Sequence, residues 1–265
     1  MTSYHRYAIK TFIKGIVEEV LINGGVDGFI ANSTLTKELL LKAFPKIDST
    51  KIRVSWPSIP KQFINAETSV NNNIISTNKY ENIAICSFLH IDYLDGADLL
   101  PKIFLVIKNE FRDLKMHVIG SIYNEYVKTL LLKFAKLNKD FNVYFGYYPY
   151  EFIKTVLRQC IILVYPARLK FFGVPVLEAM YEGLIPIVTD MTGAKDFVRI
   201  IDESLIVKLD NSLVNNIANK IINLIVENKD EIVYKMTTAR RLAWKWFLIS
   251  KGWFLRQLLH IIVYG

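Results

Sequence analysis

Short runs of aliphatic and β-branched residues recur along the chain, separated by segments with the periodicity of a helix. Eight such runs predict strands, at Gly28–Ala31, Ile52–Ser55, Ile83–Phe88, Lys115–Ile119, Asn142–Phe145, Ile161–Tyr165, Ile185–Val188 and Leu205–Lys208. Several of these, such as IILVY at 161–165, are apolar at every position, which is typical of strands buried on both faces in a parallel sheet. Strand and helix alternating in this way predict an open, doubly wound α/β sheet.

One stretch, from Trp56 to Lys79, interrupts the alternation. It contains two prolines and three consecutive asparagines and has no sustained periodicity, which indicates a linker between two units. The predicted organisation is a partial N-terminal α/β unit (1–58), a linker (59–80), a doubly wound domain (81–233) and basic, aromatic C-terminal helices (234–265).

Composition narrows the class of protein. Of 265 residues, 52% are apolar and 22% are charged, which excludes intrinsic disorder. Two cysteines, Cys86 and Cys160, are too few for a disulfide framework, and no Cys/His spacing suggests zinc. The first residues have no apolar region typical of a signal peptide, and no run of 18 apolar residues suggests a membrane span. We therefore expect a cytoplasmic protein.

Positive charge is concentrated near the C-terminal end. The formal net charge is +8, and the segment from Tyr234 to Gly265 holds six basic residues, three tryptophans and no acidic residue. Such a segment favours an anionic partner, for example the inner face of a membrane, but it could equally pack on the first unit. No nucleic-acid-binding motif accompanies the charge, so no nucleic acid is expected as a partner. Gly252 is expected to divide this segment into two helices, near 237–249 and 253–263.

Loops after the predicted strands are the candidate binding positions, because ligands of open α/β sheets bind at the carboxyl ends of the strands. Gly120 and Gly146 follow two strands directly, while Phe172-Gly173 and Thr192-Gly193-Ala194 lie in the loops after two others. Backbone N–H groups in such turns can hold an anion. Taken singly, each loop is a weak signal, since glycines serve ordinary turns in most proteins.

The order and spacing of these loops carry a resemblance. The segments are VIG (118–120), YFGYYPYEFIKTVLRQC (144–160) and ILVYPARLKFFGVPVLEAMYEGLIPIVTDMTGAKDFV (162–198). Together they resemble the nucleotide-binding half of the GT-B glycosyltransferases, in particular the GT4 family, also called glycosyl transferases group 1. Residues 26–59 resemble the end of that family's first domain. The resemblance implies a Rossmann-like GT-B C-terminal domain with a short remnant of the N-terminal Rossmann-like domain and C-terminal helices.

The resemblance also implies roles for individual residues in binding a nucleotide-diphosphate sugar, with no cofactor and no metal. Glu178 matches the glutamate that accepts hydrogen bonds from the ribose hydroxyls, a role that suits the acceptor-only oxygens of a carboxylate. Gly120 and Gly146 would leave space for the base. The sugar hydroxyls and the diphosphate would be held by the backbone N–H groups of Phe172, Gly173, Val174, Thr192, Gly193 and Ala194.

Three positions depart from the family pattern. Lys170 stands where the family has its first glutamate, and His90 and Asp95 stand near the positions of an arginine and a lysine that neutralise the departing diphosphate. Lys170 and Arg168, on the loop of the signature, and Lys195, at the start of the following helix, are expected to supply the missing positive charge; the alternative is that they are solvated loop cations. Lys170, Arg168 and His90 are therefore the catalytic candidates.

The predicted activity is transfer of a hexose to a hydroxyl acceptor, a glycan, lipid or protein, with retention of configuration as the resemblance implies. Most of the acceptor-side domain has no counterpart in the sequence, so a dimer partner or another chain could complete it. The alternative is a catalytically inactive, nucleotide-binding module that partners an active transferase, which Lys170 and Asp95 favour.

Overall fold

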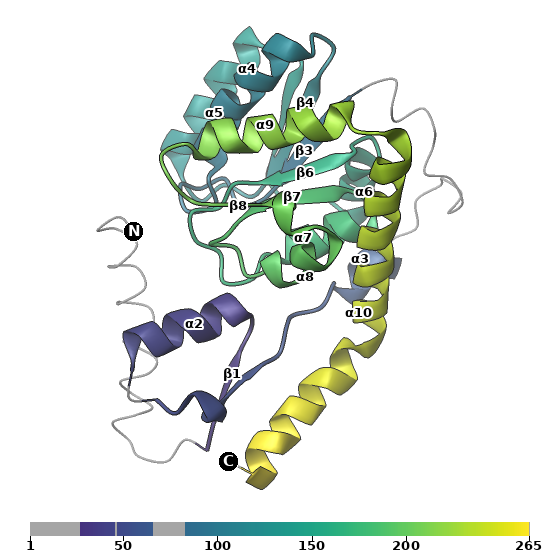
Figure 1. The fold of residues 1–265 in the computed structure, drawn as a ribbon. Helices are drawn as coiled ribbons and strands as arrows, with labels where there is room; N and C mark the ends of the chain where they lie inside the picture. Colours follow the sequence, from purple (N-terminus) through teal and green to yellow (C-terminus); the bar gives the residue numbers. More distant parts are fainter. Residues whose placement is uncertain (1–26, 46, 66–82, 265) are drawn as a thin grey trace.

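The computed structural model describes residues 27–45, 47–65 and 83–264 (Figure 1). At its centre is a parallel sheet of six strands in the order β5-β4-β3-β6-β7-β8. The order runs outward in both directions from the β3–β6 pair, which confirms the doubly wound α/β fold. The strands are β3 (Ala84–Phe88), β4 (Lys115–Gly120), β5 (Phe141–Phe145), β6 (Ile162–Tyr165), β7 (Ile185–Thr189) and β8 (Ile206–Val207).

Helices cover both faces of this sheet (Figure 1). One face carries α4 (Leu100–Glu110), α5 (Glu125–Leu137) and α9 (Leu213–Val226). The other carries α6 (Tyr150–Leu157), α7 (Val174–Tyr181) and α8 (Lys195–Ile201). With helices on both sides, the central strands need apolar side chains at every position, which is what their sequences provide.

The N-terminal unit is small and packs against the main domain. It consists of β1 (Phe29–Ala31), α2 (Thr34–Ala43) and β2 (Ile52–Val54), and the two strands pair in parallel. Its core of six buried residues includes Leu169 from the loop after β6. The unit therefore completes its core with a residue of the larger domain.

The segment predicted as a linker begins with a short helix. Helix α3 spans Lys61–Asn65, and its Phe63 is fully buried against the ring of Tyr150 on α6. This start of the segment is therefore packed on the sheet domain. The rest of the predicted linker, residues 66–80, lies outside the described residues.

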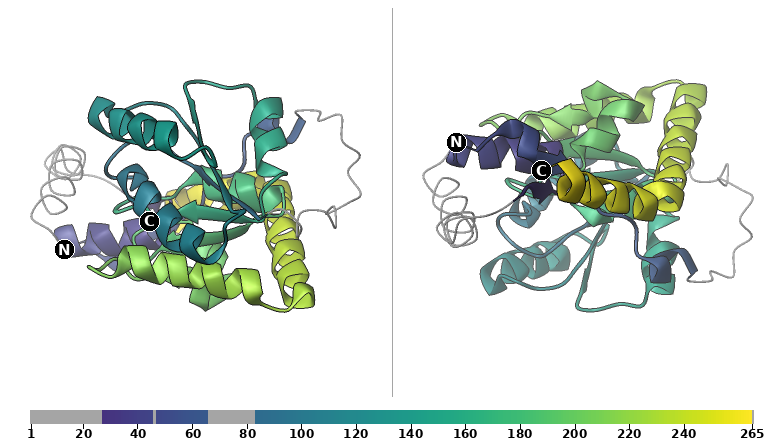
Figure 2. Two further views of the ribbon diagram at one scale, coloured as in Figure 1. Left: turned by 90° about the horizontal axis from the view of Figure 1, so that it is seen from above. Right: turned by 90° about the horizontal axis from the view of Figure 1, so that it is seen from below.

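Helix α10 (Lys229–Tyr264) is continuous for 36 residues, so the prediction that Gly252 divides it is wrong. A glycine inside a helix costs only about 1 kcal/mol, and the packing of neighbouring residues offsets that cost. Trp253 donates to the carbonyl of Val54 at 3.3 Å, and His260 lies 2.9 Å from the Arg53 guanidinium. Figure 2 shows α10 running from the sheet domain to the N-terminal unit. Packing of this basic segment on the first unit was one of the two alternatives drawn from the sequence.

No helix in the described part of the chain has the length and apolarity needed to cross a bilayer.

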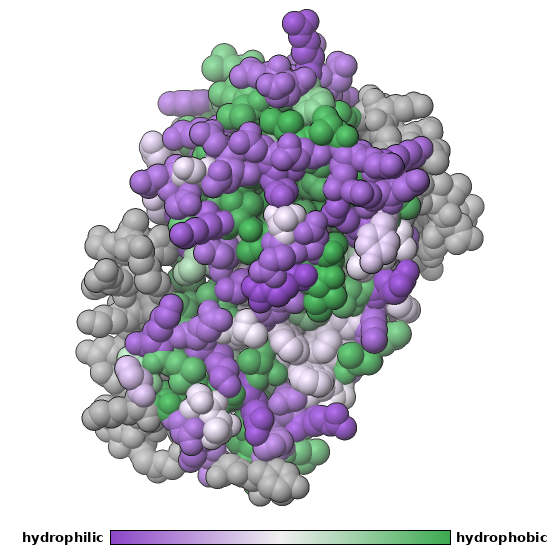
Figure 3. Space-filling model, in the orientation of Figure 1, coloured by the Kyte–Doolittle hydropathy of each residue, from purple (hydrophilic) through white to green (hydrophobic). Residues whose placement is uncertain are grey.

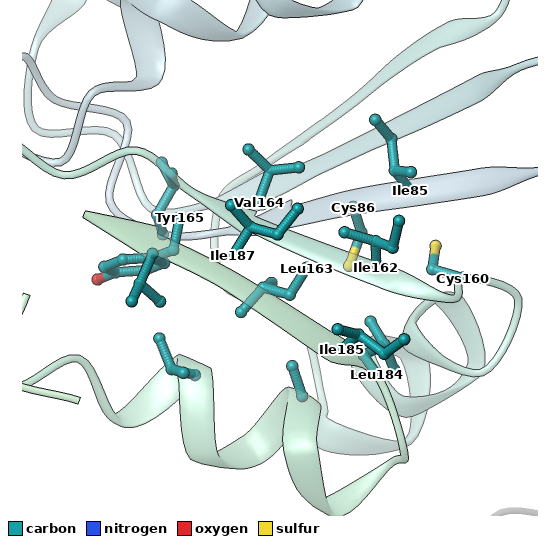
Figure 4. Close-up of a cluster of buried hydrophobic side chains, with 14 of the residues drawn as sticks. Ile85, Cys86, Cys160, Ile162, Leu163, Val164, Tyr165, Leu184, Ile185 and Ile187 are labelled. Carbon is teal, nitrogen blue, oxygen red and sulfur yellow. The ribbon is translucent and has the colours of Figure 1, made fainter. Parts of the chain in front are cut away.

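The core of the main domain is centred on β3, β6 and β7 (Figure 4). Ile85, Leu163 and Ile187 are fully buried there, as are the two cysteines. Tyr165 ends β6 and is also fully buried, with its hydroxyl at the carboxyl edge of the sheet. This edge is where the chemistry-bearing loops meet.

Candidate functional site

Two glycines bring the loops at the carboxyl edge into close contact. A Cβ on Gly96 would lie 2.0 Å from the carbonyl oxygen of Pro166, and one on Gly120 would lie 1.8 Å from that of Leu89. The loop after β3 is thereby pressed against the ends of β4 and β6. Gly120, expected to leave space for a base, is required by this backbone packing, whereas nothing lies within 4 Å of a Cβ on Gly146.

Glu178 is a buried carboxyl group on α7. Its residue is 4% exposed, and burial raises its pKa to about 8. Within the described residues its side chain has no hydrogen-bond partner. Burial alone accounts for the raised pKa. A ligand hydroxyl that donates to this carboxyl group would favour its charged form.

Tyr165 lies beside this carboxyl group and is similarly unsatisfied. Its hydroxyl is buried without a hydrogen-bond partner. Burial, followed by the charges of Asp95 and Glu178, raises the pKa of the phenol well above its usual value. No role was predicted for Tyr165 from the sequence, although a tyrosine at the end of a fully apolar strand is a usable signal, because a buried hydroxyl needs a partner.

The N-terminus of α7 presents free backbone donors. Gly173 caps the helix with a φ of 100°, a conformation that favours glycine. In the part of the chain that the structure describes, the N–H groups of Phe172, Gly173 and Val174 have no backbone acceptor. First-turn N–H groups together with the helix dipole favour an anion.

The turn Thr192–Ala194 has its N–H groups already bonded. They donate to the carbonyls of Thr189, Lys170 and Phe172 at 3.1, 2.8 and 2.8 Å respectively. A Cβ on Gly193 would lie 2.0 Å from the carbonyl oxygen of Phe171. These groups, which the resemblance assigns to the diphosphate, instead hold the 170–172 loop against the turn in this structure.

The three positions that depart from the family pattern converge on one cluster. The Lys170 ammonium lies 3.0 and 3.1 Å from the carboxylate oxygens of Asp95 and 3.2 Å from Nδ1 of His90. Asp95 is 3% exposed and also accepts from the backbone N–H of His90 at 3.0 Å. Lys170 and Asp95 therefore form a charge pair at the carboxyl edge of the sheet.

His90 is held as a neutral imidazole in this cluster. Its pKa is lowered by partial burial and then by the positive charge of Lys170. Its ring stacks on Tyr123 with 4.4 Å between centroids. A neutral imidazole nitrogen can accept a hydrogen bond from the ammonium, which orients Lys170.

The side chains of Arg168 and Lys195 are bonded to groups outside this cluster. Arg168 makes a bidentate ion pair with Asp98 at 2.7 and 2.8 Å, and its guanidinium lies 3.7 Å from the centroid of the Tyr93 ring. Lys195 donates to the carbonyl of Asp190 at 2.9 Å. Of the three cations expected to compensate for the missing charge, the structure places only Lys170 beside His90 and Asp95.

A second group that sequence reasoning missed joins the two units. Asp196, in the first turn of α8, accepts from the Trp56 indole at 2.6 Å and from the backbone N–H of Thr34 at 3.0 Å. A cavity of about 640 Å³ opens nearby, within the usual size range of small-molecule sites. It lies between α2 and the loops after β6, β7 and β8, and Lys42, Arg168 and Asp190 are among its lining residues.

Comparisons with known proteins agree on the family. A family model described as Glycosyl transferases group 1 matches residues 72–239, more than half of the chain. No curated protein sequence matches.

Solved structures share the fold at low sequence identity. A glycosyltransferase from Rickettsia africae is 18% identical with a TM-score of 0.67, over 90% of this chain and 64% of that one. TarM of S. aureus is 15% identical (TM-score 0.65, 89% and 44%), and WaaG, a glycosyltransferase involved in lipopolysaccharide biosynthesis, is 13% identical (0.64, 89% and 62%). The chain therefore spans less than two thirds of each of these proteins.

Proposed function

Because this chain belongs to the glycosyl transferases group 1 family, we propose that it is a glycosyltransferase that moves a hexose from a nucleotide-diphosphate sugar to a hydroxyl acceptor. The observation that carries the proposal is the buried carboxyl of Glu178, unpaired among the described residues and close to the N-terminus of α7. The carboxylate can accept hydrogen bonds from two vicinal hydroxyls, and the N-terminus of the helix can bind a diphosphate.

Glu178 would bind the ribose of the donor as a carboxylate. In the free protein burial holds its pKa near 8, so it is mostly protonated at neutral pH. Two ribose hydroxyls donating to its oxygens stabilise the charged form and lower the pKa. Donor binding is therefore coupled to loss of the proton.

The diphosphate would lie between the N-terminus of α7 and the ammonium of Lys170. The N–H groups of Phe172, Gly173 and Val174 supply donors, and Lys170 supplies a full positive charge. Negative charge develops on the diphosphate as the sugar leaves, and fixed donors aimed at that charge lower the barrier. In this proposal the transfer needs no metal ion, because these groups carry the electrostatic stabilisation of the diphosphate. The transfer proceeds with retention of configuration, as the family resemblance implies.

Asp95 and His90 would act through Lys170. Their contacts of 3.0–3.2 Å fix the ammonium in one position. The carboxylate of Asp95 also offsets the positive charge of Lys170. Binding of the diphosphate therefore depends more on the N-terminus of α7 than it would in a site with unpaired cations. His90 is accordingly proposed as a positioning residue.

The affinity of the protein for a panel of nucleotides and nucleotide sugars tests this proposal. UDP, GDP, ADP and their glucose or mannose conjugates are titrated by calorimetry into the wild type, Glu178→Gln and the exposed control Glu151→Gln. We expect one base to bind and Glu178→Gln to weaken its binding about tenfold or more, because an amide offers a single acceptor oxygen. Absence of binding to every member of the panel, or unchanged binding in Glu178→Gln, would contradict the proposal.

The alternative is an inactive nucleotide-binding module, and the Lys170–Asp95 pair is the observation that favours it. An ammonium neutralised by a buried carboxylate stabilises a departing diphosphate less than a free one. Binding of a nucleotide sugar with neither transfer nor hydrolysis by the purified protein supports this alternative. Sedimentation velocity then shows whether a second copy or another chain is needed to complete the acceptor side.

A further inference from the structure

The C-terminal half of α10 carries a row of exposed apolar side chains on its outward face. Spacings of three, four and seven residues, with one adjacent pair, place these side chains along one side of the helix. Leu248 and Ile262 are 61% and 67% exposed. The row, called the outer stripe below, consists of Trp244, Leu248, Leu255, Leu258, Leu259 and Ile262.

The opposite face of the same helix is already used for packing. Trp246 is buried and donates to the carbonyl of Pro57, and Trp253 stacks on Trp56 at 5.9 Å. These contacts fix the rotation of α10 about its axis. Apart from Trp244, whose ring lies 5.8 Å from that of Tyr181 on α7, the outer stripe is consequently turned away from the core.

Positive charges lie beside the outer stripe and, at Lys251 between Leu248 and Leu255, within it. Lys245, Lys251 and Arg256 are exposed on the same half of the helix, and the sequence has no acidic residue after Glu231. Figure 3 shows hydrophilic and hydrophobic side chains side by side along this part of the surface. Exposed leucines beside lysine and arginine are typical of helices that lie in a membrane interface.

The charge pattern decides between two occupants of this surface. A second copy packed on the stripe would bring Lys245, Lys251 and Arg256 toward the same residues, with no acidic side chain on this half of α10 to compensate. Anionic lipid headgroups would complement all three cations, and their acyl boundary would take up the apolar side chains. The observations thus favour an anionic bilayer.

We propose that α10 docks the protein on an anionic membrane, with the outer stripe inserted at the headgroup boundary. From Trp244 to Ile262 the stripe extends about 27 Å along the helix axis, at 1.5 Å per residue. The helix lies on the bilayer in this proposal and does not cross it. The contacts of Trp246 and Trp253 remain intact, so docking requires no change in the fold.

Vesicle co-sedimentation tests the proposal without any nucleotide. Wild-type protein is mixed with vesicles of phosphatidylcholine alone or with one third phosphatidylglycerol. We expect binding to the anionic vesicles, at least about tenfold weaker binding to the neutral ones, and weakening as the salt rises from about 0.1 M to about 0.5 M. Binding to neither vesicle, or equal binding to both, would overturn the proposal.

Two sets of variants assign the binding to α10. Leu255→Glu with Leu259→Glu should reduce binding to anionic vesicles at least about tenfold, because the stripe then carries charge. Lys245→Gln, Lys251→Gln and Arg256→Gln together should remove the dependence on phosphatidylglycerol. The matched control is Lys133→Gln with Leu137→Glu on α5, where both residues are exposed, and it should bind as the wild type does.

Fold and self-association are checked on the same samples. Circular dichroism melts should coincide for all variants, since the substituted side chains are exposed. If Leu255→Glu with Leu259→Glu converts a dimer to a monomer and leaves vesicle binding unchanged, the stripe is a contact between copies and the proposal is wrong. Because the readout is lipid binding, its failure leaves the donor-binding proposal untouched.

Discussion

At the scale of single residues, two buried polar groups mark the site. Within the described structure the Tyr165 hydroxyl is buried without a hydrogen-bond partner, and burial raises the pKa of the Glu178 carboxyl to about 8. Both conditions lower the stability of the folded protein at neutral pH, and such local costs are typical of binding sites. The sequence could mark Glu178 through its motif, but it could not show that the carboxyl is desolvated.

Glu178→Gln is predicted to change the pH dependence of stability. A folded-state pKa of about 8, against a usual value of 4.5, means that the stabilisation by the bound proton is complete below about pH 4.5 and is lost as the pH rises toward 8. Glutamine does not titrate. The melting temperature of Glu178→Gln minus that of the wild type should therefore be larger at pH 8 than at pH 5, by at least about 3 °C. An equal difference at both pH values would show that the carboxyl is not desolvated in the folded protein.

Lys170 and Asp95 are predicted to be coupled in stability. Lys170→Met leaves the buried carboxylate of Asp95 without its ammonium and should cost about 2 kcal/mol, less than a fully buried pair because Lys170 is partly exposed. Asp95→Asn in the same chain should recover part of that loss. Urea unfolding of the two single variants and the double variant measures the coupling. Strictly additive effects would indicate that the two side chains do not interact.

At the scale of elements, periodicity and burial predicted the strands well. The all-apolar runs at 161–165 and 185–188 correspond to β6 and β7, because strands between two helix layers tolerate few polar residues. Helix α10 was predicted less well. Gly252 is a local signal for a break, whereas the contacts that accompany the continuous helix come from Trp56, Val54 and Pro57, which are distant in the sequence.

Because α10 is continuous through Gly252, we predict that Gly252→Ala stabilises the protein. A Cβ at Gly252 would meet nothing within 4 Å, and alanine favours a helix over glycine by about 1 kcal/mol. The variant should melt a few degrees above the wild type, as measured by circular dichroism. A lower melting temperature would mean that the helix is broken or bent at this position in solution. Ala239→Gly, at a buried position of the same helix, serves as a control and should destabilise.

At the scale of the whole molecule, two units are joined so that loops from both lie near one edge of the sheet. Asp196 binds Thr34 and Trp56, and Ser33 donates to the carbonyl of Phe171 on the loop after β6. Spacing in the sequence predicted which loops would meet, because parallel strands end at the same edge. It could not predict that Thr192–Ala194 would be bonded internally, or that Lys170, Asp95 and His90 would form one cluster, since these depend on tertiary contacts.

The most direct test of the account is the number of protons released when the nucleotide binds. Calorimetric titration at pH 7 in two buffers of different ionisation enthalpy gives this number for the wild type and for Glu178→Gln. The account predicts release of most of one proton by the wild type, because ribose hydroxyls convert a protonated Glu178 into a carboxylate. It predicts almost none for Glu178→Gln. Tight binding by the wild type with no proton released would contradict the claim that Glu178 holds the ribose.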